Sequence, residues 1–337
     1  MNIDSHPIKF RKALSAWYTV GRRPLPWRTE PSLYRTVVSE FMTQQTKIKT
    51  MLPYFEAWMK SFPDFDSLAK AEDQAVLKHW EGLGYYNRAR NLHKLAKVYV
   101  NLKIKPKSKE EWQQMPGIGP YTSAAISSIA LGQANAVVDG NVVRVLARLN
   151  DDDRKFKNNG LAVKAFTSTA DNLLDDKNPG DHNQSMMELG ATVCLKNKPL
   201  CTICPVSKFC VAKERGTQED RPKIESKSIV RIEIERAWVR KGDCILLHHI
   251  SENSSQLAGQ YELPELKMIS GNVSDKRLLL SQSRSITNRR IKEHIYKCTT
   301  KERNEDLLEW VPLGRLQGIT LSGPHRRWVK DLLKIDN

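Results

Sequence analysis

The segment 115–123 constrains the fold of this 337-residue chain more than any other part of it. It reads Met-Pro-Gly-Ile-Gly-Pro-Tyr-Thr-Ser and lies between two predicted helices, 110–114 and 121–131. Its glycines, Gly117 and Gly119, lack the Cβ atoms that would keep the backbone away from a ligand. The N–H groups and the dipole at the start of the second helix then favour a phosphate. The alternative is an ordinary tight turn between two helices.

Charge and composition bear on that choice. The formal net charge is +16, which indicates a polyanionic partner such as DNA or, less specifically, a lysine-rich solvated surface. Together with the glycine hairpin, the charge favours binding of a DNA backbone. The apolar fraction of 40% is enough for a packed core. No apolar run could span a bilayer and residues 1–12 do not resemble a secretory signal, so we expect an intracellular protein that is neither membrane-bound nor secreted.

Periodicity predicts two domains and a linker. Apolar residues recur at helical spacing at 10–18, 34–41, 55–62 and 92–99, which predicts an all-α domain over residues 1–216. Residues 217–229 read as a polar linker. Beyond it, apolar and charged residues alternate over 231–240, a turn follows at Gly242-Asp243, and 244–247 reads as a second strand. We therefore expect a separate α+β domain over residues 230–337.

A carboxylate follows the hairpin at Asp139, within Val137-Val138-Asp139-Gly140-Asn141. An aspartate at the start of a helix is commonly an N-cap, and on this segment alone that interpretation is favoured. The hairpin and this segment together resemble the helix-hairpin-helix DNA glycosylases, and the resemblance extends through most of residues 25–210. It implies a helix-hairpin-helix glycosylase fold in which Asp139 is catalytic.

Tyr121 bears on which reaction the resemblance implies. At the matching hairpin position, endonuclease III-like members of the superfamily carry a lysine that forms a Schiff base with the sugar. A tyrosine cannot form one. The sequence therefore predicts a glycosylase that removes a base without a lyase step.

Four further segments resemble the adenine DNA glycosylases of the MutY family, which excise adenine opposite 8-oxoguanine. Each segment alone is a weak match, and the resemblance depends on their order and spacing along the chain. They are Leu25-Pro26-Trp27-Arg28, Ser39-Glu40-Phe41-Met42-Thr43-Gln44-Gln45-Thr46, Gly82-Leu83-Gly84-Tyr85-Tyr86 and 183–190.

The resemblance implies roles for four residues. Adenine leaves readily only after protonation at N7, so a general acid is needed, and Glu40 is the candidate if burial raises its pKa. Asp139 would stabilise the oxocarbenium-like sugar or bond to it transiently. Tyr121 and Asn141 would position the two carboxylates. The alternative for Glu40 is a solvated helix residue.

The flipped adenine and the opened duplex need contacts too. The resemblance places Gln45 and Tyr85 as wedges in the duplex, with Thr46 beside them. Core packing is the alternative for both wedges, more serious for Tyr85. Other residues would line the adenine pocket; these are Trp27, Arg28 and Glu188. Glu188 could instead form a cap or an ion pair.

Four of the six cysteines cluster in the segment 194–210 with the spacing C-x6-C-x2-C-x5-C; they are Cys194, Cys201, Cys204 and Cys210. Four thiolates suit zinc or an iron–sulfur cluster, and chemistry alone leaves both open. The superfamily resemblance implies one [4Fe–4S] cluster. A monovalent cation at the hairpin is a further expectation. The separate Cys244 and Cys298 read as packed strand residues.

The C-terminal domain resembles the Nudix-like domain with which this family reads 8-oxoguanine. The segment 257–264 carries that resemblance, and no glutamate-rich Nudix box follows it, which predicts recognition rather than hydrolysis. The family's lesion loop matches best at Ile286-Thr287-Asn288. Thr287 keeps the hydroxyl, but the family's aromatic and histidine are absent there.

Two rival functions stay open at this stage. One is a thymine glycosylase acting on G·T mismatches, which Glu40 disfavours because N7 protonation serves a purine. The other is a catalytically silent iron–sulfur DNA-binding protein, which the two carboxylates disfavour. We expect a monomer that binds duplex DNA containing A·8-oxoguanine or A·G, in the nucleoid of a bacterium or the nucleus of a eukaryote. The sequence does not identify any protein partner.

Overall fold

A computed structural model describes residues 3, 6–225, 228–251, 253–254, 257–269, 274–286, 288–300 and 307–336. The chain divides into two compact units, each built from two stretches of sequence. The first unit spans residues 1–44 and 98–226, and the second spans residues 45–97 and 227–337.

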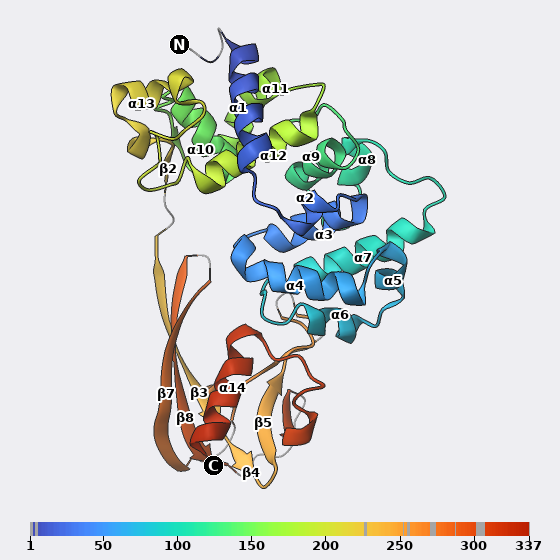
Figure 1. The fold of residues 1–337 in the computed structure, drawn as a ribbon. Coiled ribbons are helices and arrows are strands. Elements are labelled where there is room, and N and C mark those ends of the chain that lie inside the picture. Colours follow the sequence, from blue (N-terminus) through green and yellow to red (C-terminus); the bar gives the residue numbers. More distant parts are fainter. Residues whose placement is uncertain are drawn as a thin grey trace. The chain divides into compact units, whose positions relative to one another are not determined.

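The first unit consists almost entirely of helices (Figure 1). Proline occupies the first turn of four of them, where its missing N–H has no intrahelical partner to lose. The helices of this unit are α1 (Pro7–Gly21), α2 (Pro26–Thr29), α3 (Leu33–Thr43), α8 (Lys109–Gln113), α9 (Pro120–Ile129), α10 (Gly140–Leu149), α11 (Asn159–Leu173), α12 (Pro179–Thr192) and α13 (Val211–Arg215).

Helix α10 lies at the centre of the first unit and packs against α11, α12 and α13. Its apolar face is buried together with Phe10 and Leu14 of α1 and Phe166 of α11. The predicted helix at 10–18 is confirmed, since Phe10, Leu14 and Tyr18 are its buried positions. The end of α10 that carries Asp139 is thus fixed by this core, while Ala124 and Ala125 of α9 pack with Val137 in a separate cluster.

The second unit begins with four helices, α4 (Ile48–Ser61), α5 (Phe65–Lys70), α6 (Asp73–His79) and the part of α7 (Asn87–Asn101) up to Lys97. Trp58 of α4 packs edge to face on Trp80, with 5.4 Å between ring centroids. Leu92, Leu95 and Ala96 are among the buried apolar positions of α7. The predicted stripes at 55–62 and 92–99 are therefore confirmed.

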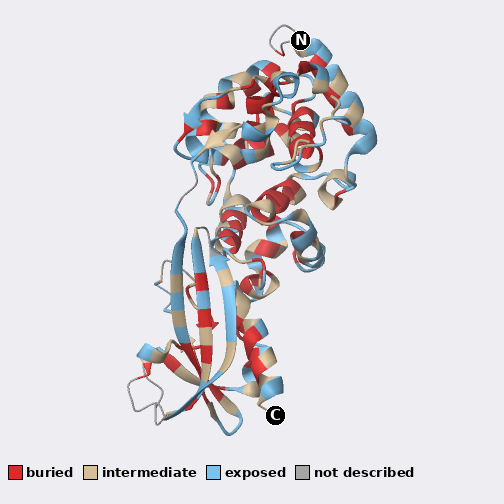
Figure 2. Ribbon diagram, turned by 90° about the vertical axis from the view of Figure 1, so that its left-hand side faces the viewer, coloured by how far each residue is buried: buried red, intermediate tan, exposed pale blue. Residues whose placement is uncertain are grey.

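The strands of this unit form two small sheets. In one, β8 (Arg289–Thr299) lies between β3 (Val230–Trp238), which is parallel to it, and β7 (Ser274–Ile286), which is antiparallel. In the other, β5 (Cys244–His249) pairs with β4 (Arg240–Lys241), β6 (Tyr261–Glu262) and β9 (Leu308–Pro312). Figure 2 shows buried residues along the middle strand β8 and on one side of α14 (Gly323–Ile335).

The strands predicted near 231–240 and 244–247 are confirmed, and so is the turn at Gly242-Asp243. The all-α prediction for residues 1–216 needs one correction, because β1 (Lys155–Phe156) pairs in parallel with β2 (Lys223–Ile224). Two-residue strands are too short for an alternating pattern to reveal them. The boundaries 1–216, 217–229 and 230–337 remain a prediction. Among the described residues, no helix combines the length and apolarity needed to cross a membrane.

Candidate active site

Glu40 lies on α3 with its side chain buried, so it is not the solvated residue of the alternative interpretation. Its Oε2 has no hydrogen-bond partner among the described residues. Burial, with a smaller contribution from the negative charge of Asp139, raises the pKa of Glu40 to about 7 against the opposing effect of a hydrogen bond with Tyr121. The Tyr121 hydroxyl also lies 3.4 Å from the Met187 sulfur. This carboxyl group can hold and release a proton near neutral pH.

Asp139 caps α10, as the simpler interpretation of the sequence predicts. Its Oδ1 accepts a hydrogen bond of 2.7 Å from the Val142 N–H, and its Oδ2 accepts one of 2.8 Å from Asn141 Nδ2. Burial raises the pKa of Asp139, whereas these hydrogen bonds act to lower it. The cap fixes the carboxylate in one orientation, so structural and chemical roles are compatible in this residue.

Arg144 connects this carboxylate to the cysteine segment. Its Nη2 donates to Asn141 Oδ1 at 3.0 Å and to the Gly190 carbonyl at 2.8 Å, and its Nε donates to the Cys194 carbonyl at 2.8 Å. A Cβ atom added to Gly190 would lie 2.6 Å from the Asn141 Cβ, so α12 and α10 approach closely at this point. Asn141 is therefore held from both sides.

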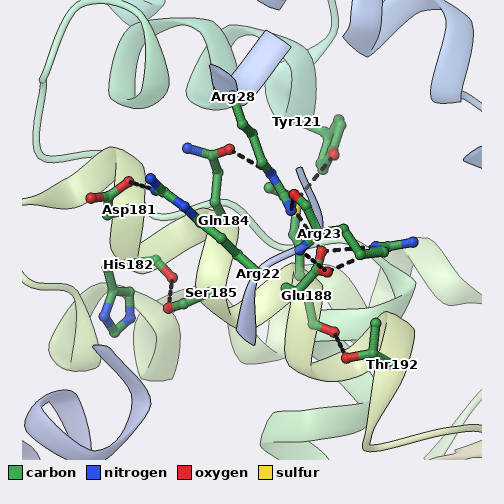
Figure 3. A network of polar contacts seen from close by, with 11 residues as sticks. Arg22, Arg23, Arg28, Tyr121, Asp181, His182, Gln184, Ser185, Glu188 and Thr192 are labelled. Atoms are coloured by element: carbon green, nitrogen blue, oxygen red, sulfur yellow. Dashed lines mark hydrogen bonds and ion pairs between the residues drawn. The ribbon is translucent and has the colours of Figure 1, made fainter. Parts of the chain in front are cut away.

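A second buried carboxylate, Glu188, differs from Glu40 in that two arginines surround it. It pairs with Arg23 at 2.6 Å and with Arg28 at 3.0 Å (Figure 3). Burial alone would raise the pKa of Glu188, but the hydrogen bonds and charges of the two arginines hold it below its ordinary value. Arg28 also donates to Gln184 at 3.0 Å and lies over the Tyr18 ring. Glu188 is thus a charged, fixed acceptor while Glu40 is poised to carry a proton.

The two hairpin glycines serve different purposes, one through its backbone conformation and the other through the space it leaves open. Gly117 adopts a φ of 75°, which favours glycine on conformational grounds. Gly119 has an extended conformation, and a Cβ added there would meet nothing within 4 Å. No side chain caps the first turn of α9, which begins at Pro120. The open space at Gly119 is what a close approach by an external ligand requires.

The two proposed wedges lie in the second unit. Gln45 and Tyr85 both have positive φ values, 55° and 50°, although neither is glycine. Tyr85 is 44% exposed, so its core-packing alternative is wrong, and Gln45 is exposed as well. The buried Arg88 donates to Thr46 Oγ1 at 3.1 Å and lies over the Tyr85 ring. Arg88 therefore supports both the loop that contains Thr46 and the loop that contains Tyr85.

The four clustered cysteines line one small cavity together with Arg148. The Arg148 guanidinium is buried and donates to Cys194 Sγ at 3.3 Å and to the Leu195 carbonyl at 2.7 Å. None of the four is in a disulfide. In the described part of the chain, no group of three or more His, Cys, Asp or Glu side chains is arranged to hold a single metal ion.

In the C-terminal strands, Asn288 is half-buried and its Nδ2 donates to the Ser228 carbonyl at 2.8 Å. Thr287 lies outside the described residues. Cys298 is buried on β8 and Cys244 is half-buried on β5, in agreement with their predicted positions on strands.

Comparison with known proteins identifies the central part of this arrangement. Residues 38–164, which contain Glu40, Tyr121 and Asp139, match the family described as "HhH-GPD superfamily base excision DNA repair protein". The chain is 39% identical over 267 residues to the adenine DNA glycosylase of Homo sapiens, covering 76% of this chain and 48% of that protein. Against the adenine DNA glycosylase of Arabidopsis thaliana it is 34% identical, covering 87% of this chain and 51% of that protein.

The chain thus spans about half the length of these curated relatives. Among solved structures it resembles a thermostable thymine-DNA glycosylase, with a TM-score of 0.56 at 25% identity, covering 63% of this chain and 98% of that one. It also resembles endonuclease III in a complex with DNA, with a TM-score of 0.53 at 17% identity, covering 65% of this chain and 100% of that one. The helix-hairpin-helix glycosylase fold and the resemblance to adenine DNA glycosylases are confirmed.

The structure brings Glu40, Tyr121, Asp139 and Asn141 together around the start of α10. It also joins Arg28 to Glu188. Sequence reasoning missed four arginines that hold these groups: Arg23, Arg88, Arg144 and Arg148. Only Arg23 gave a usable signal, because it lies next to the motif that contains Arg28.

Proposed function

We propose that this chain is a monofunctional adenine DNA glycosylase that hydrolyses the N-glycosidic bond of adenine opposite 8-oxoguanine or guanine. The observation that carries the proposal is the pair of carboxyl groups around Tyr121. Glu40 is buried with its pKa raised to about 7, and Asp139 is fixed by hydrogen bonds from Asn141 and the backbone. Different environments suit two carboxyl groups for different tasks in one reaction.

In the proposed reaction, Glu40 gives its proton to N7 of the flipped adenine. The C1′–N9 bond then breaks, its electron pair leaves with the base, and positive charge develops on the sugar. The Asp139 carboxylate stabilises that charge or bonds to C1′ transiently. Water attacks C1′ and passes a proton to the Glu40 carboxylate, which restores the starting state. Tyr121 and Asn141 act as positioning residues for the two carboxyl groups.

Strand cleavage by a Schiff base is absent from this proposal, because Tyr121 stands where a lyase needs an amine. The product is an abasic site in an intact strand.

Recognition of adenine is assigned to Trp27, Arg28 and Glu188. A carboxylate that stays charged suits the acceptance of hydrogen bonds from an exocyclic amine. Arg28 is held by Glu188 and Gln184, so its donors are fixed before a base arrives. Preorganisation of this kind favours binding of one base geometry over others.

For DNA binding we propose that the hairpin at Gly117 and Gly119 receives a backbone phosphate, with a monovalent cation at the same turn. Gln45 and Tyr85 would enter the duplex, supported through Thr46 and Arg88. Exposure of Tyr85 together with its positive φ supports this, since strained exposed side chains concentrate at functional sites. An enzyme with this substrate acts in the compartment that holds the cell's DNA.

The four cysteines fit a [4Fe–4S] cluster better than zinc. A zinc ion needs its sulfurs about 2.3 Å from one centre, whereas each cysteine of a cluster binds a different iron. Four sulfurs around one cavity, with the spacing that resembles the superfamily's cluster segment, agree with the cluster. The cationic Arg148 beside Cys194 suits an anionic group. The cluster would tie the segment 194–210 to α10 and supply structure rather than a catalytic step.

We propose that residues 230–337 form a Nudix-like domain that reads 8-oxoguanine. The mixed sheet β3-β8-β7 and the helix α14 agree with an α+β domain. The loop containing Thr287 and Asn288 would contact the lesion. No Nudix box is present in the sequence, so no hydrolysis of a diphosphate is assigned to it.

The likeness to a thymine-DNA glycosylase favours a second candidate, removal of thymine from T·G. Single-turnover assays on A·8-oxoguanine, A·G and T·G duplexes separate the two, with products analysed before and after alkali. We expect fastest release of adenine from A·8-oxoguanine, with breaks only after alkali. Preference for T·G, or breaks before alkali, would overturn the proposal.

A further inference from the structure

The second unit contains a cavity of about 810 Å³ that the glycosylase reaction does not use. Its walls come from α6 and α7 on one side and from β5, β6 and the residues near 315–320 on the other. All of its lining residues belong to the second unit, and none belongs to the Glu40 and Asp139 site. Its volume lies in the range typical of small-molecule sites.

One wall of this cavity is a basic helix face. Arg90, His93, Lys94 and Lys97 follow each other at i, i+3, i+4 and i+7 on α7, and all four line the cavity. Like charges at this spacing destabilise a helix by a few tenths of a kcal/mol for each pair, about 0.2–0.5. Helix stability therefore does not account for this face.

The only carboxylate among the described lining residues is Asp73, which lies 2.9 Å from His93 Nδ1 and 3.2 Å from Lys97 Nζ. It cannot balance the charge of Arg90, Lys94 and Lys97 together. One terminal nitrogen of Arg90 is buried with no hydrogen-bond partner among the described residues, while the other donates to the Ala258 carbonyl. The basic wall is therefore incompletely satisfied by the protein.

The opposite wall contains two stacked aromatic rings, with Arg315 beside them. The rings of His249 and Tyr261 stack with centroids 4.5 Å apart and planes 16° from parallel. Ile319 adds apolar surface to this wall, while Val76 and Leu77 of α6 add apolar surface on the side of α7. A ring stacked on one face keeps its plane fixed, which lowers the cost of stacking a further flat ring against it.

We propose that this cavity binds a nucleoside phosphate, with its phosphate groups on the basic face of α7 and its base against the His249 ring. Phosphate needs several cationic donors, and a base needs a flat aromatic surface. The cavity presents both within one unit. This site is separate from the glycosylase reaction, and the proposal does not depend on that reaction.

Calorimetric titration of the full chain tests the proposal, with ADP and inorganic pyrophosphate as the two probes. The protein is first saturated with undamaged duplex, so that anion sites on the DNA-binding surface are occupied. We expect one ADP per chain and at least tenfold weaker binding of pyrophosphate, which lacks the base. No saturable binding of ADP at millimolar concentration would overturn the proposal, as would equal affinity for the two probes.

Two variants localise the site. Lys94→Glu should weaken ADP and pyrophosphate alike, by at least about tenfold, because it places an anion beside the phosphates. His249→Ala should weaken ADP and leave pyrophosphate unchanged. Lys330→Glu, a matched charge reversal of an exposed lysine on α14, should change neither. If Lys94→Glu and His249→Ala, shown by circular dichroism to be folded, bind ADP like the unmodified chain, the cavity is not the site.

Discussion

The buried carboxyl group of Glu40 yields a prediction that links catalysis to stability. Replacing it in Glu40→Gln removes the proton donor and keeps the shape of the side chain. General acid catalysis contributes roughly 10²- to 10⁴-fold to such reactions, so the rate of adenine release should fall by about that factor. Glu56→Gln, a change of an exposed glutamate on α4, is the matched control and should leave the rate unchanged.

The magnitude of the pH effect follows from the pKa of about 7 that burial gives Glu40. Half of the molecules carry the catalytic proton at pH 7, and about one in a hundred carries it at pH 9. The rate should therefore be constant at lower pH, fall to half near pH 7, and decline about tenfold for each further pH unit. A solvated glutamate with its ordinary pKa of 4.5 would instead have lost most of its proton by pH 6.

The same shift affects folding. Because the native state holds this proton more tightly than the unfolded chain, its contribution to stability is complete below pH 4.5 and is lost as pH rises through about 7. The rise in pKa corresponds to about 3 kcal/mol. Glu40→Gln should therefore gain about that much in unfolding free energy relative to the unmodified chain between pH 4.5 and pH 8, while it loses activity.

Urea unfolding at pH 4.5 and pH 8, with single-turnover rates between pH 6 and pH 9, measures both effects. A pH-independent rate, or a Glu40→Gln variant with no relative gain in stability at pH 8, would refute the assignment of Glu40 as a buried acid.

Three other changes test the surrounding structure. Gly190→Ala places a methyl group 2.6 Å from the Asn141 Cβ, so it should cost about 1–3 kcal/mol of unfolding free energy and slow excision. The control Gly314→Ala, which has open space around it, should change neither quantity. Tyr85→Ala should leave the unfolding free energy within about 0.5 kcal/mol but weaken binding to mismatched duplex relative to matched duplex, measured by fluorescence anisotropy; equal effects on both would argue against a wedge. Arg148→Met should lower the iron content per chain and cost about 1–3 kcal/mol in thermal unfolding, and unchanged iron would contradict its place beside the cluster.

Local patterns predicted much of this molecule. The helical stripes, the hairpin and the two strands after residue 230 each depend on neighbours along the chain, so spacing alone revealed them. The short pairing of β1 with β2 carried no such pattern. The sequence also placed Asp139 at a helix start, and its capping hydrogen bond follows from that position.

What could not be predicted depends on contacts between distant segments. Glu188 and Arg23 are 165 positions apart, and only the folded chain shows that they pair. The burial of Glu40 likewise comes from packing around α3, so the sequence left a solvated glutamate as the alternative. Arg88 and Arg144 hold motif residues, Thr46 and Asn141, through side-chain contacts that the motifs themselves do not reveal.

The central claim is that Asp139 performs chemistry from a capping position, and Asp139→Asn tests it most directly. Asparagine caps helices about as well as aspartate, so the fold and the affinity for A·8-oxoguanine duplex should be retained. The single-turnover rate of adenine release should fall roughly a hundredfold or more, because the charge that stabilises the sugar is gone. A variant that keeps its full rate, or that loses binding and thermal stability together with activity, would contradict the claim and leave Asp139 as a structural cap alone.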